Sequence, residues 1–301
     1  MEGSDADVQR VYDMRLWRAA AQGLPLPLEC IDRVNSKKFV WKIVRVAVWN
    51  NHGSTAVALL KLLGRVVLQC VDALYMYVGP FMLAARHGCV NAVMSLLQAK
   101  ASVNYCDFHR GTAASAAAQN GQVEMVRLLA DLKADLDEED TGGNVPLTWA
   151  AMNGHADIMT LLLERGVDVD ASGPANFTPL VAACSRGKFL GAQMLLAVKA
   201  AVNPARRHDD SRYTPLTAAV ASGNLSLVSL LLAAKASINT RGCQQTPVAR
   251  ASQLGHTGTV RLLIKSKADV NERSYRSPMY YARNKEHTAI VRLLVAAKAQ
   301  V

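Results

Sequence analysis

The sequence has few aromatic residues and no cysteine pattern that would build a disulfide or zinc framework. Phe, Trp and Tyr make up 6% of the 301 residues, although half of the chain is apolar. An apolar set dominated by Ala, Leu and Val, with so few rings, favours closely packed helices over a β-sandwich. The six cysteines are Cys30, Cys70, Cys89, Cys106, Cys184 and Cys243. They stand far apart, and we interpret them as free thiols in a reducing compartment.

The chain also lacks the motifs that mark common catalytic and cofactor sites. It contains no P-loop, no Gly-x-Gly-x-x-Gly after a strand, no His-Glu-x-x-His and no Gly-x-Ser-x-Gly. The seven histidines are scattered, and we expect His87 and His109 to lie in solvent. Five carboxylates cluster in residues 135–140, but without the ligand spacing of an EF-hand loop they indicate a solvated acidic hairpin. We therefore predict no enzymatic activity, no cofactor and no metal.

No segment reads clearly as a leader or a membrane span. The first residues are acidic and are not followed by an apolar run, so we expect no secretory signal. The longest apolar stretch runs from Val66 to Ala85, but Asp72 lies inside it and Gly79-Pro80 interrupts it. We expect no membrane span and a cytoplasmic or nuclear location.

What the chain does contain is one frame of residues that recurs seven times. A full copy combines Thr178-Pro179-Leu180, Gly187 and Lys199-Ala200-Ala201-Val202-Asn203. The frame glycines are Gly88, Gly121, Gly154, Gly187, Gly223 and Gly255, with Glu286 in the last copy. A fixed position follows twelve residues after each of them, and it is Lys100, Lys133, Gly166, Lys199, Lys235, Lys267 and Lys298. Variation in length falls outside this block, as expected for a helix pair followed by a surface loop.

Each frame residue has a physical reason to stand where it does. Thr or Ser at the start predicts a helix N-cap, and the proline after it suits the first helical position. Paired alanines such as Ala182-Ala183 predict close approach of neighbouring helices. The frame glycine predicts a left-handed residue that ends the first helix. A lysine held in that conformation costs about 1 kcal/mol relative to glycine.

These residues resemble the ankyrin repeat, and the resemblance covers residues 79–301. Two departures are the missing histidine of the first helix and the lysine that replaces the glycine at the fixed position. The resemblance implies an all-α repeat solenoid of stacked helix-turn-helix units with β-hairpin loops. We place the seven units at about 79–111, 112–144, 145–177, 178–213, 214–245, 246–276 and 277–301.

Upstream of these units the frame is worn. One worn copy uses Leu16, Ala19-Ala20 and Gly23, and a doubtful second copy is aligned on Gly53, which sets Trp49 where a small residue is expected. We interpret residues 1–78 as a degenerate N-terminal cap, with one or two worn units as the alternative.

The resemblance implies that a partner protein docks on a concave face built from the hairpin tips and first helices. The connector from Lys199 to Thr214 is three residues longer than the standard one, basic, and ends in an aromatic residue. Arg and Tyr are enriched at the energetic centres of interfaces. The predicted partner-binding residues are Phe108, His109, Trp149, Met152, Phe177, Arg186, Arg206, Arg207, Arg212, Tyr213 and Arg276.

Charge divides the chain into two zones. Residues 186–301 contain 18 Lys or Arg and 5 Asp or Glu, whereas residues 107–170 contain 4 and 12. This polarity suits an oriented interaction surface in a scaffold. Two alternatives stay open: binding of nucleic acid or another polyanion through the basic C-terminal half, and an adaptor that recruits substrates through residues 1–78.

Overall fold

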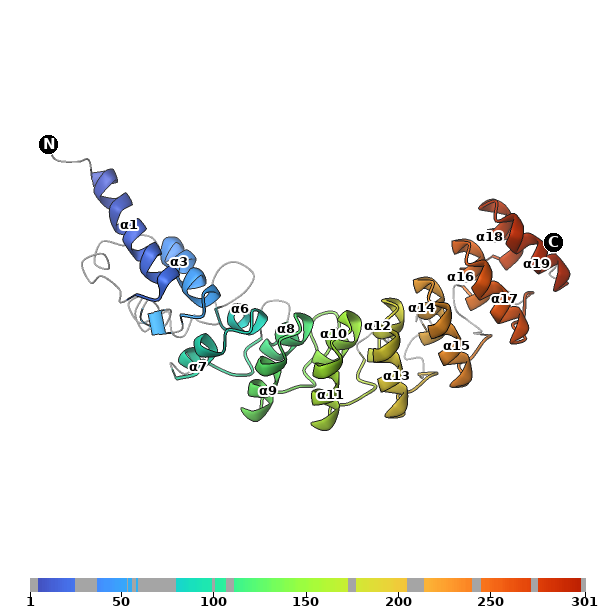
Figure 1. Cartoon of the computed structure of the whole chain (residues 1–301), viewed down its shortest axis with the longest axis horizontal. Coiled ribbons are helices and arrows are strands. Elements are labelled where there is room, and N and C mark those ends of the chain that lie inside the picture. Colours follow the sequence, from blue (N-terminus) through green and yellow to red (C-terminus); the bar gives the residue numbers. More distant parts are fainter. Residues whose placement is uncertain are drawn as a thin grey trace. The chain divides into compact units, whose positions relative to one another are not determined.

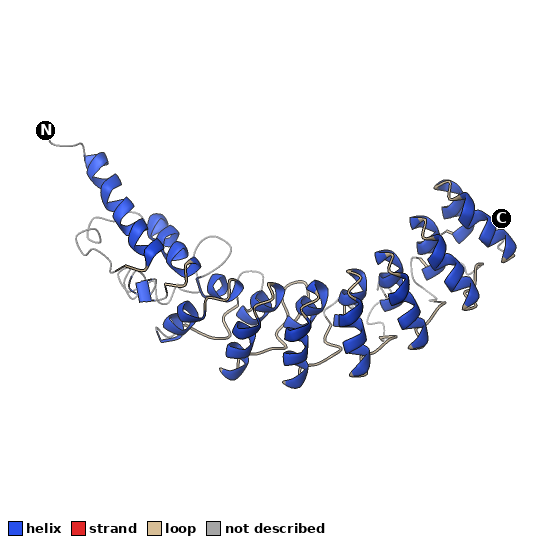
Figure 2. Cartoon of the chain, viewed as in Figure 1, coloured by secondary structure: helices blue, strands red, loops and turns tan. Residues whose placement is uncertain are grey.

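The computed structural model describes residues 5–24, 37–52, 54–55, 58, 80–98, 101–106, 111–172, 177–204, 214–239, 245–271 and 276–298. The chain divides into two compact units, Met1–Thr141 and Gly142–Val301. In the described residues the regular structure is helical (Figure 2), apart from one isolated antiparallel β-bridge between Cys106 and Thr112. The chain is an all-α repeat solenoid, as predicted.

The structure describes only part of the loops that were predicted to be β-hairpins. The connector at 134–145 is described throughout and consists of turns and bends without a strand. The tips at 107–110, 173–176, 205–213, 240–244 and 272–275 lie outside the described residues.

Among its described residues, the first unit has one long helix, one of intermediate length and two short helix pairs (Figure 1). The helices are α1 (Asp5–Gln22), α3 (Lys37–Trp49), α6 (Pro80–Arg86), α7 (Val90–Gln98), α8 (Ala113–Gln119) and α9 (Val123–Asp131). Helices α1, α3, α6 and α8 pack in sequence against one another, and α7 and α9 pack against α6 and α8.

The described part of the second unit has five helix pairs in two layers (Figure 1). The first helices are α10 (Pro146–Asn153), α12 (Pro179–Ser185), α14 (Pro215–Ser222), α16 (Pro247–Leu254) and α18 (Pro278–Asn284). The second helices are α11 (Ala156–Glu164), α13 (Phe189–Ala197), α15 (Leu225–Ala233), α17 (Thr257–Lys265) and α19 (Thr288–Ala296). Each helix contacts the preceding and following members of its own layer, so every repeat is packed against its neighbours.

The helix starts follow the predicted chemistry. The Thr178 hydroxyl accepts a hydrogen bond from the Val181 amide at 3.3 Å, and Pro179 takes the first helical position. Thr214 and Thr217 form a reciprocal pair, in which each hydroxyl accepts from the other residue's amide, at 3.1 and 2.8 Å. The predicted caps are therefore confirmed, and they satisfy amide groups that have no partner inside the helix.

Small residues lie where neighbouring first helices meet. The alanine pairs Ala150-Ala151, Ala182-Ala183 and Ala218-Ala219 are buried. A Cβ on Gly191 of α13 would lie 3.7 Å from the Ala183 Cβ, which places α12 and α13 in close contact. The prediction that paired alanines allow close helix approach is confirmed.

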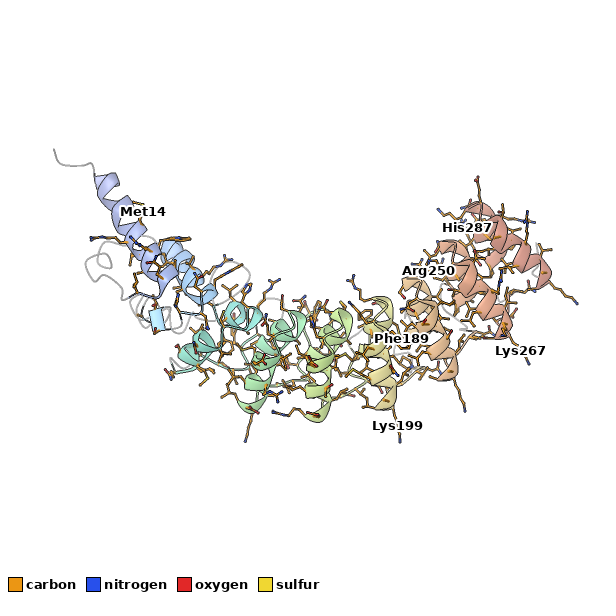
Figure 3. The ribbon with its side chains drawn as sticks, in the orientation of Figure 1. Met14, Phe189, Lys199, Arg250, Lys267 and His287 are labelled. Carbon is orange, nitrogen blue, oxygen red and sulfur yellow. The ribbon has the colours of Figure 1, made fainter. Side chains whose placement is uncertain are left out.

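The left-handed positions are also confirmed. All six frame glycines have positive φ, and so does Glu286 in the last copy. Lys133, Lys199, Lys235, Lys267 and Lys298 have φ angles between 59° and 65°. Lys199 and Lys267 point away from the helices into solvent (Figure 3). The helix C-terminus favours their positive charge, which offsets part of the conformational cost.

A set of side-chain hydrogen bonds links successive repeats at the end of each second helix, and the sequence analysis did not predict it. In the second unit Asp170 accepts from the Ala201 amide at 2.9 Å, and Asn203 accepts from the Ser237 amide at 2.7 Å. Asn239 accepts from the Asp269 amide at 2.9 Å. We call Asp170, Asn203, Asn239 and Asn271 the Asx ladder.

Two members of the Asx ladder also donate. The Asn203 side-chain amide donates to the Lys235 carbonyl oxygen at 3.1 Å, and Asn271 donates to the Lys298 carbonyl oxygen at 3.2 Å. One asparagine side chain can thus satisfy both an amide and a carbonyl group of the following repeat. The ladder fixes the register between repeats because it pairs backbone amide and carbonyl groups that have no hydrogen-bond partner within a helix.

We expect Asn203→Ala to lower the free energy of unfolding of the second unit by about 1–2 kcal/mol, because two inter-repeat hydrogen bonds are lost at a solvent-exposed site. Urea unfolding followed by circular dichroism measures the change. The matched control is Gln193→Ala on the exposed face of α13, which should alter stability by less than about 0.5 kcal/mol. Equal effects of the two changes would show that the ladder contributes nothing.

The N-terminal helices end in the same way as the frame helices. Gly23 ends α1 with φ 68°, as the worn first copy predicts. After α3 the left-handed residue is Asn51, with φ 60°, and the amide that follows it donates to the Ala47 oxygen at 2.8 Å. The alignment on Gly53 was therefore wrong by two residues. The corrected alignment puts Ala47 at the small position, whereas the assignment of 1–78 as a cap stays a prediction.

No helix among the described residues combines the length and apolarity needed to span a bilayer. The part of the tested stretch from Val66 to Gly79 lies outside those residues.

Three of the cysteines are described, and all three are free thiols. Cys89 and Cys184 are buried and Cys106 is half-buried. Burial raises the pKa of Cys184 to about 12 and also raises the pKa of Cys89. Cys30, Cys70 and Cys243 lie outside the described residues.

We expect Cys184 to resist alkylation by N-ethylmaleimide at pH 8, because its raised pKa leaves almost none of the reactive thiolate and burial blocks access. Cys106 should react first among the three. Peptide mass spectrometry after timed labelling measures the order, and labelling in guanidinium should remove it. Fast labelling of Cys184 in the folded protein would contradict its buried position.

Candidate functional site

Six of the eleven predicted partner-binding residues lie outside the described residues. They are Phe108, His109, Arg206, Arg207, Arg212 and Tyr213. Their roles therefore stay predictions.

The other five fall into two separate places. Trp149 and Met152 are half-buried on α10, Phe177 is half-buried just before α12, and Arg186 is exposed at the end of α12. Helices α10 and α12 are packed together, so these four residues belong to neighbouring repeats. Arg276 precedes α18, and α14 and α16 separate it from α12. The structure does not bring Arg276 to the other four.

Arg276 instead belongs to one of two groups of polar and aromatic side chains on or just before the neighbouring helices α16 and α18, the other being centred on Arg250. We call Gln245, Arg250, Gln253, Arg276 and Tyr280 the C-terminal site. It is built on α16 and α18, which pack against each other, and Arg250 extends from the first-helix layer (Figure 3).

Hydrogen bonds hold Arg250 in place. Its Nη1 donates to Gln253 Oε1 at 2.8 Å and to Gln245 Oε1 at 3.5 Å. The Gln245 side-chain amide also donates to Gln253 Oε1, at 3.2 Å. These neutral partners orient the guanidinium without neutralising its charge, so it keeps its attraction for an anion.

Aromatic contacts hold the second half of the site. The Arg276 guanidinium carbon lies 4.3 Å from the centroid of the Tyr280 ring, which is a cation–π distance. Tyr280 meets Tyr281 edge to face, with ring centroids 5.8 Å apart and planes at 82°. Tyr281 is buried whereas Tyr280 is 41% exposed, so a core residue supports the exposed ring.

Within the segments 245–255 and 276–285 the charged residues are Arg250, Arg276, Arg283 and Lys285, all positive. Glu286 follows directly, and Glu272 lies outside the described residues. The sequence analysis missed Arg250 and Tyr280. Tyr280 occupies the frame position where most other copies carry a small or β-branched residue. A large aromatic residue at this position could have identified Tyr280 as a candidate from the sequence.

His256, which follows the frame glycine Gly255 in the second unit, has a structural role. His256 Nδ1 lies 3.0 Å from the Val220 oxygen, and a Cβ on Gly223 would stand 3.2 Å from the same ring. His256 therefore packs on the preceding repeat. His87 was expected in solvent, but it is half-buried, with its ring centroid 4.3 Å from that of Trp49. The contact with the Trp49 ring of α3 removes part of the His87 ring from water.

The acidic segment at 135–140 bends at 136–137, where the Asp137 amide donates to the Asp135 carboxylate at 2.9 Å. Asp135 and Asp137 are exposed, whereas Glu138, Glu139 and Asp140 are half-buried, so the predicted solvated acidic hairpin is only partly solvated. Among the residues that the structure describes, no group of three or more His, Cys, Asp or Glu side chains is arranged to hold a metal ion.

Comparisons with known proteins agree with this architecture. A family model of three ankyrin repeats matches residues 81–173 and 170–242, and a single-repeat model matches residues 243–275. The crystal structure of the human ASB11 ankyrin repeat domain is similar, with a TM-score of 0.61 and 24% identity over 71% of this chain and 96% of that domain. This likeness concerns the fold alone. A comparison with curated proteins found no match. Because the family models cover more than half of its length, the chain belongs to the ankyrin-repeat family.

Proposed function

We propose that the chain is a non-enzymatic recognition module that binds a partner protein on its first-helix side, with the C-terminal site as one point of contact. Ankyrin repeats are in general protein–protein interaction modules, and stacked repeats offer extended binding surfaces. The observation that carries the proposal is the pair of preset arginines, one held by two glutamine side chains and one held over an exposed tyrosine ring.

This arrangement suits a surface that carries carboxylates. Arginine binds a carboxylate through two parallel hydrogen bonds, and arginine and tyrosine are frequent at energetic centres of interfaces. Since the side chains are already held, little rotamer freedom is lost when the partner docks. The nucleic-acid alternative has less support at this site, because a single exposed ring does not form the series of stacking platforms that single strands require.

The test compares capture by the folded wild type with capture by the triple variant Arg250→Gln, Arg276→Gln and Tyr280→Ala. Each protein is immobilised and exposed to nuclease-treated lysate of its own cells, and bound proteins are quantified by mass spectrometry. We expect the principal partner to be lost at least tenfold, equivalent to about 1.4 kcal/mol.

The matched control removes two positive charges from another helix, as Arg261→Gln and Lys265→Gln on α17. Capture by this variant should equal that of the wild type. The proposal fails if both variants lose the partner equally, since net charge would then explain the result. It also fails if nuclease treatment abolishes retention by the wild type.

The long connector before Thr214 gives a separate prediction. Replacing Arg206, Arg207, Arg212 and Tyr213 with alanine should leave the melting temperature of the protein unchanged. It should weaken capture of the partner at least tenfold, about 1.4 kcal/mol. The reason is that these residues lie between two helices in sequence and offer interface-enriched side chains. Unchanged capture by the folded variant would shift the contact to Trp149, Met152 and Arg186.

A further inference from the structure

The first unit presents two tryptophan rings to solvent at one place. Trp17 on α1 is 45% exposed and Trp49 on α3 is 60% exposed. Together with Arg45, Val46 and Asn50 they line a groove of about 320 Å³, which we call the Trp groove. Single exposed apolar residues are ordinary, but two of the largest side chains converging on one groove leave substantial apolar area in water.

The wall formed by Trp49 is fixed by the helix pair that follows. The His87 ring packs on the Trp49 ring, and the Cys89 thiol donates to the Trp49 oxygen at 3.8 Å. Asn51, two residues further on, accepts from the Ala92 amide at 3.2 Å. The end of α3 is therefore fastened to α6 and α7.

The His87 contact is one between two uncharged rings. Burial, and then the charge of Arg86, lower the pKa of His87, so the imidazole is neutral at pH 7. A rigid aromatic wall of this kind lowers the cost of ordering on binding.

The described charged side chains on the helices that form the Trp groove are all positive. On α1, α3 and α6, the charged residues whose side chains the structure describes are Arg15, Arg18, Arg45 and Arg86, and all four are exposed. Arg45 itself lines the groove. Arg45 in the lining disfavours a cationic ligand, whereas carboxylates on a partner would be attracted.

The size of the groove limits what enters it. A volume of about 320 Å³ is at the lower end of the range for small-molecule sites, so it suits one or two side chains better than a cofactor. Two rings facing one groove also differ from the extended platforms along which single-stranded nucleic acid stacks.

We propose that the Trp groove binds an acidic segment of a partner protein, with an apolar side chain of that segment inserted between Trp17 and Trp49 and its carboxylates paired with Arg45 and the neighbouring arginines. This is a second binding site, on different helices from the C-terminal site. Each site is tested with its own variants, so either one can fail alone.

The probe is a fluorescein-labelled nine-residue peptide with a central phenylalanine flanked by glutamates, titrated with the full chain by fluorescence anisotropy. We expect it to bind at least tenfold tighter than the same peptide with glutamine flanks, and tenfold tighter than the peptide with a central alanine. Equal binding of the three peptides, or no binding of the first, overturns the proposal.

Protein variants place the binding in the groove. Trp17→Ala should weaken the first peptide at least tenfold while leaving the His87 contact with Trp49 in place, and Arg45→Gln should weaken it and reduce its salt dependence. Phe189→Ala, which removes an exposed aromatic ring from α13 in the other unit, is the matched control and should bind like the wild type.

Two further results would overturn the proposal. One is loss of peptide binding in the triple variant of the C-terminal site with no loss in Trp17→Ala. The other is a twelve-nucleotide single strand that binds more tightly than the peptide and depends on Trp17, since the groove would then serve nucleic acid.

Discussion

Replacing Ala183 with aspartate is expected to unfold the Gly142–Val301 unit under conditions in which the wild type is folded. Ala183 lies on α12, which packs against α10 and α14, and its side chain is 0% exposed. A carboxylate there has neither room nor a partner. Burying an unpaired charge and overfilling a packed site together cost about 4–5 kcal/mol or more, against a typical domain stability of about 5–15 kcal/mol.

Circular dichroism during heating measures the loss, with Ala289→Asp as the matched control. Ala289 is exposed in the first turn of α19, where a negative charge is tolerated or mildly favourable. That variant should melt within a few degrees of the wild type. A wild-type melting curve for Ala183→Asp would mean that α12 does not bury this face.

The second large effect is expected at Gly255, where alanine should cost about 2–3 kcal/mol of stability. The residue has φ 78°, and an added Cβ would stand 2.8 Å from the His287 ring of the next repeat. Gly166 has nearly the same backbone, with φ 76°, but nothing lies within 4 Å of its added Cβ. Gly166→Ala should therefore carry only the conformational cost, about 1 kcal/mol.

Urea unfolding of both variants separates the two contributions. Adding His287→Ala to the Gly255→Ala variant should recover the steric part, because the ring that clashes is gone. This coupling is measurable as a double-mutant cycle. Equal destabilisation by the two alanine substitutions would show that the His287 ring does not clash with a Cβ at position 255.

The features predicted well from sequence were those that local chemistry decides. A hydroxyl before proline caps a helix, and a glycine at a fixed distance ends it, whatever surrounds them. The error at Gly53 has the same origin, because glycine was used as the marker of a left-handed residue. Asparagine also tolerates that conformation, and Asn51 adopts it.

The candidate sites were less predictable because they depend on which repeats become neighbours. Arg276 was identified by its type, but its contact with Tyr280 requires the turn into α18 to fold the guanidinium back over the ring. Trp17 and Trp49 are 32 residues apart in sequence and line one groove only because α1 packs on α3. The Asx ladder likewise joins residues about one repeat apart, which no local pattern reveals.

The Asx ladder also makes the connection between repeats less dependent on an unbroken peptide backbone. Asn203 bonds directly to the backbone at Lys235 and Ser237, while the segment 205–213 lies between Asn203 and Thr214 in sequence. Repeats on the two sides of that segment are therefore held together by helix packing and by side-chain hydrogen bonds as well as by the peptide backbone. A chain cut within 205–213 keeps all of these contacts. The protein could be supplied as two fragments that reassemble, or receive a whole inserted domain at this point, without loss of register.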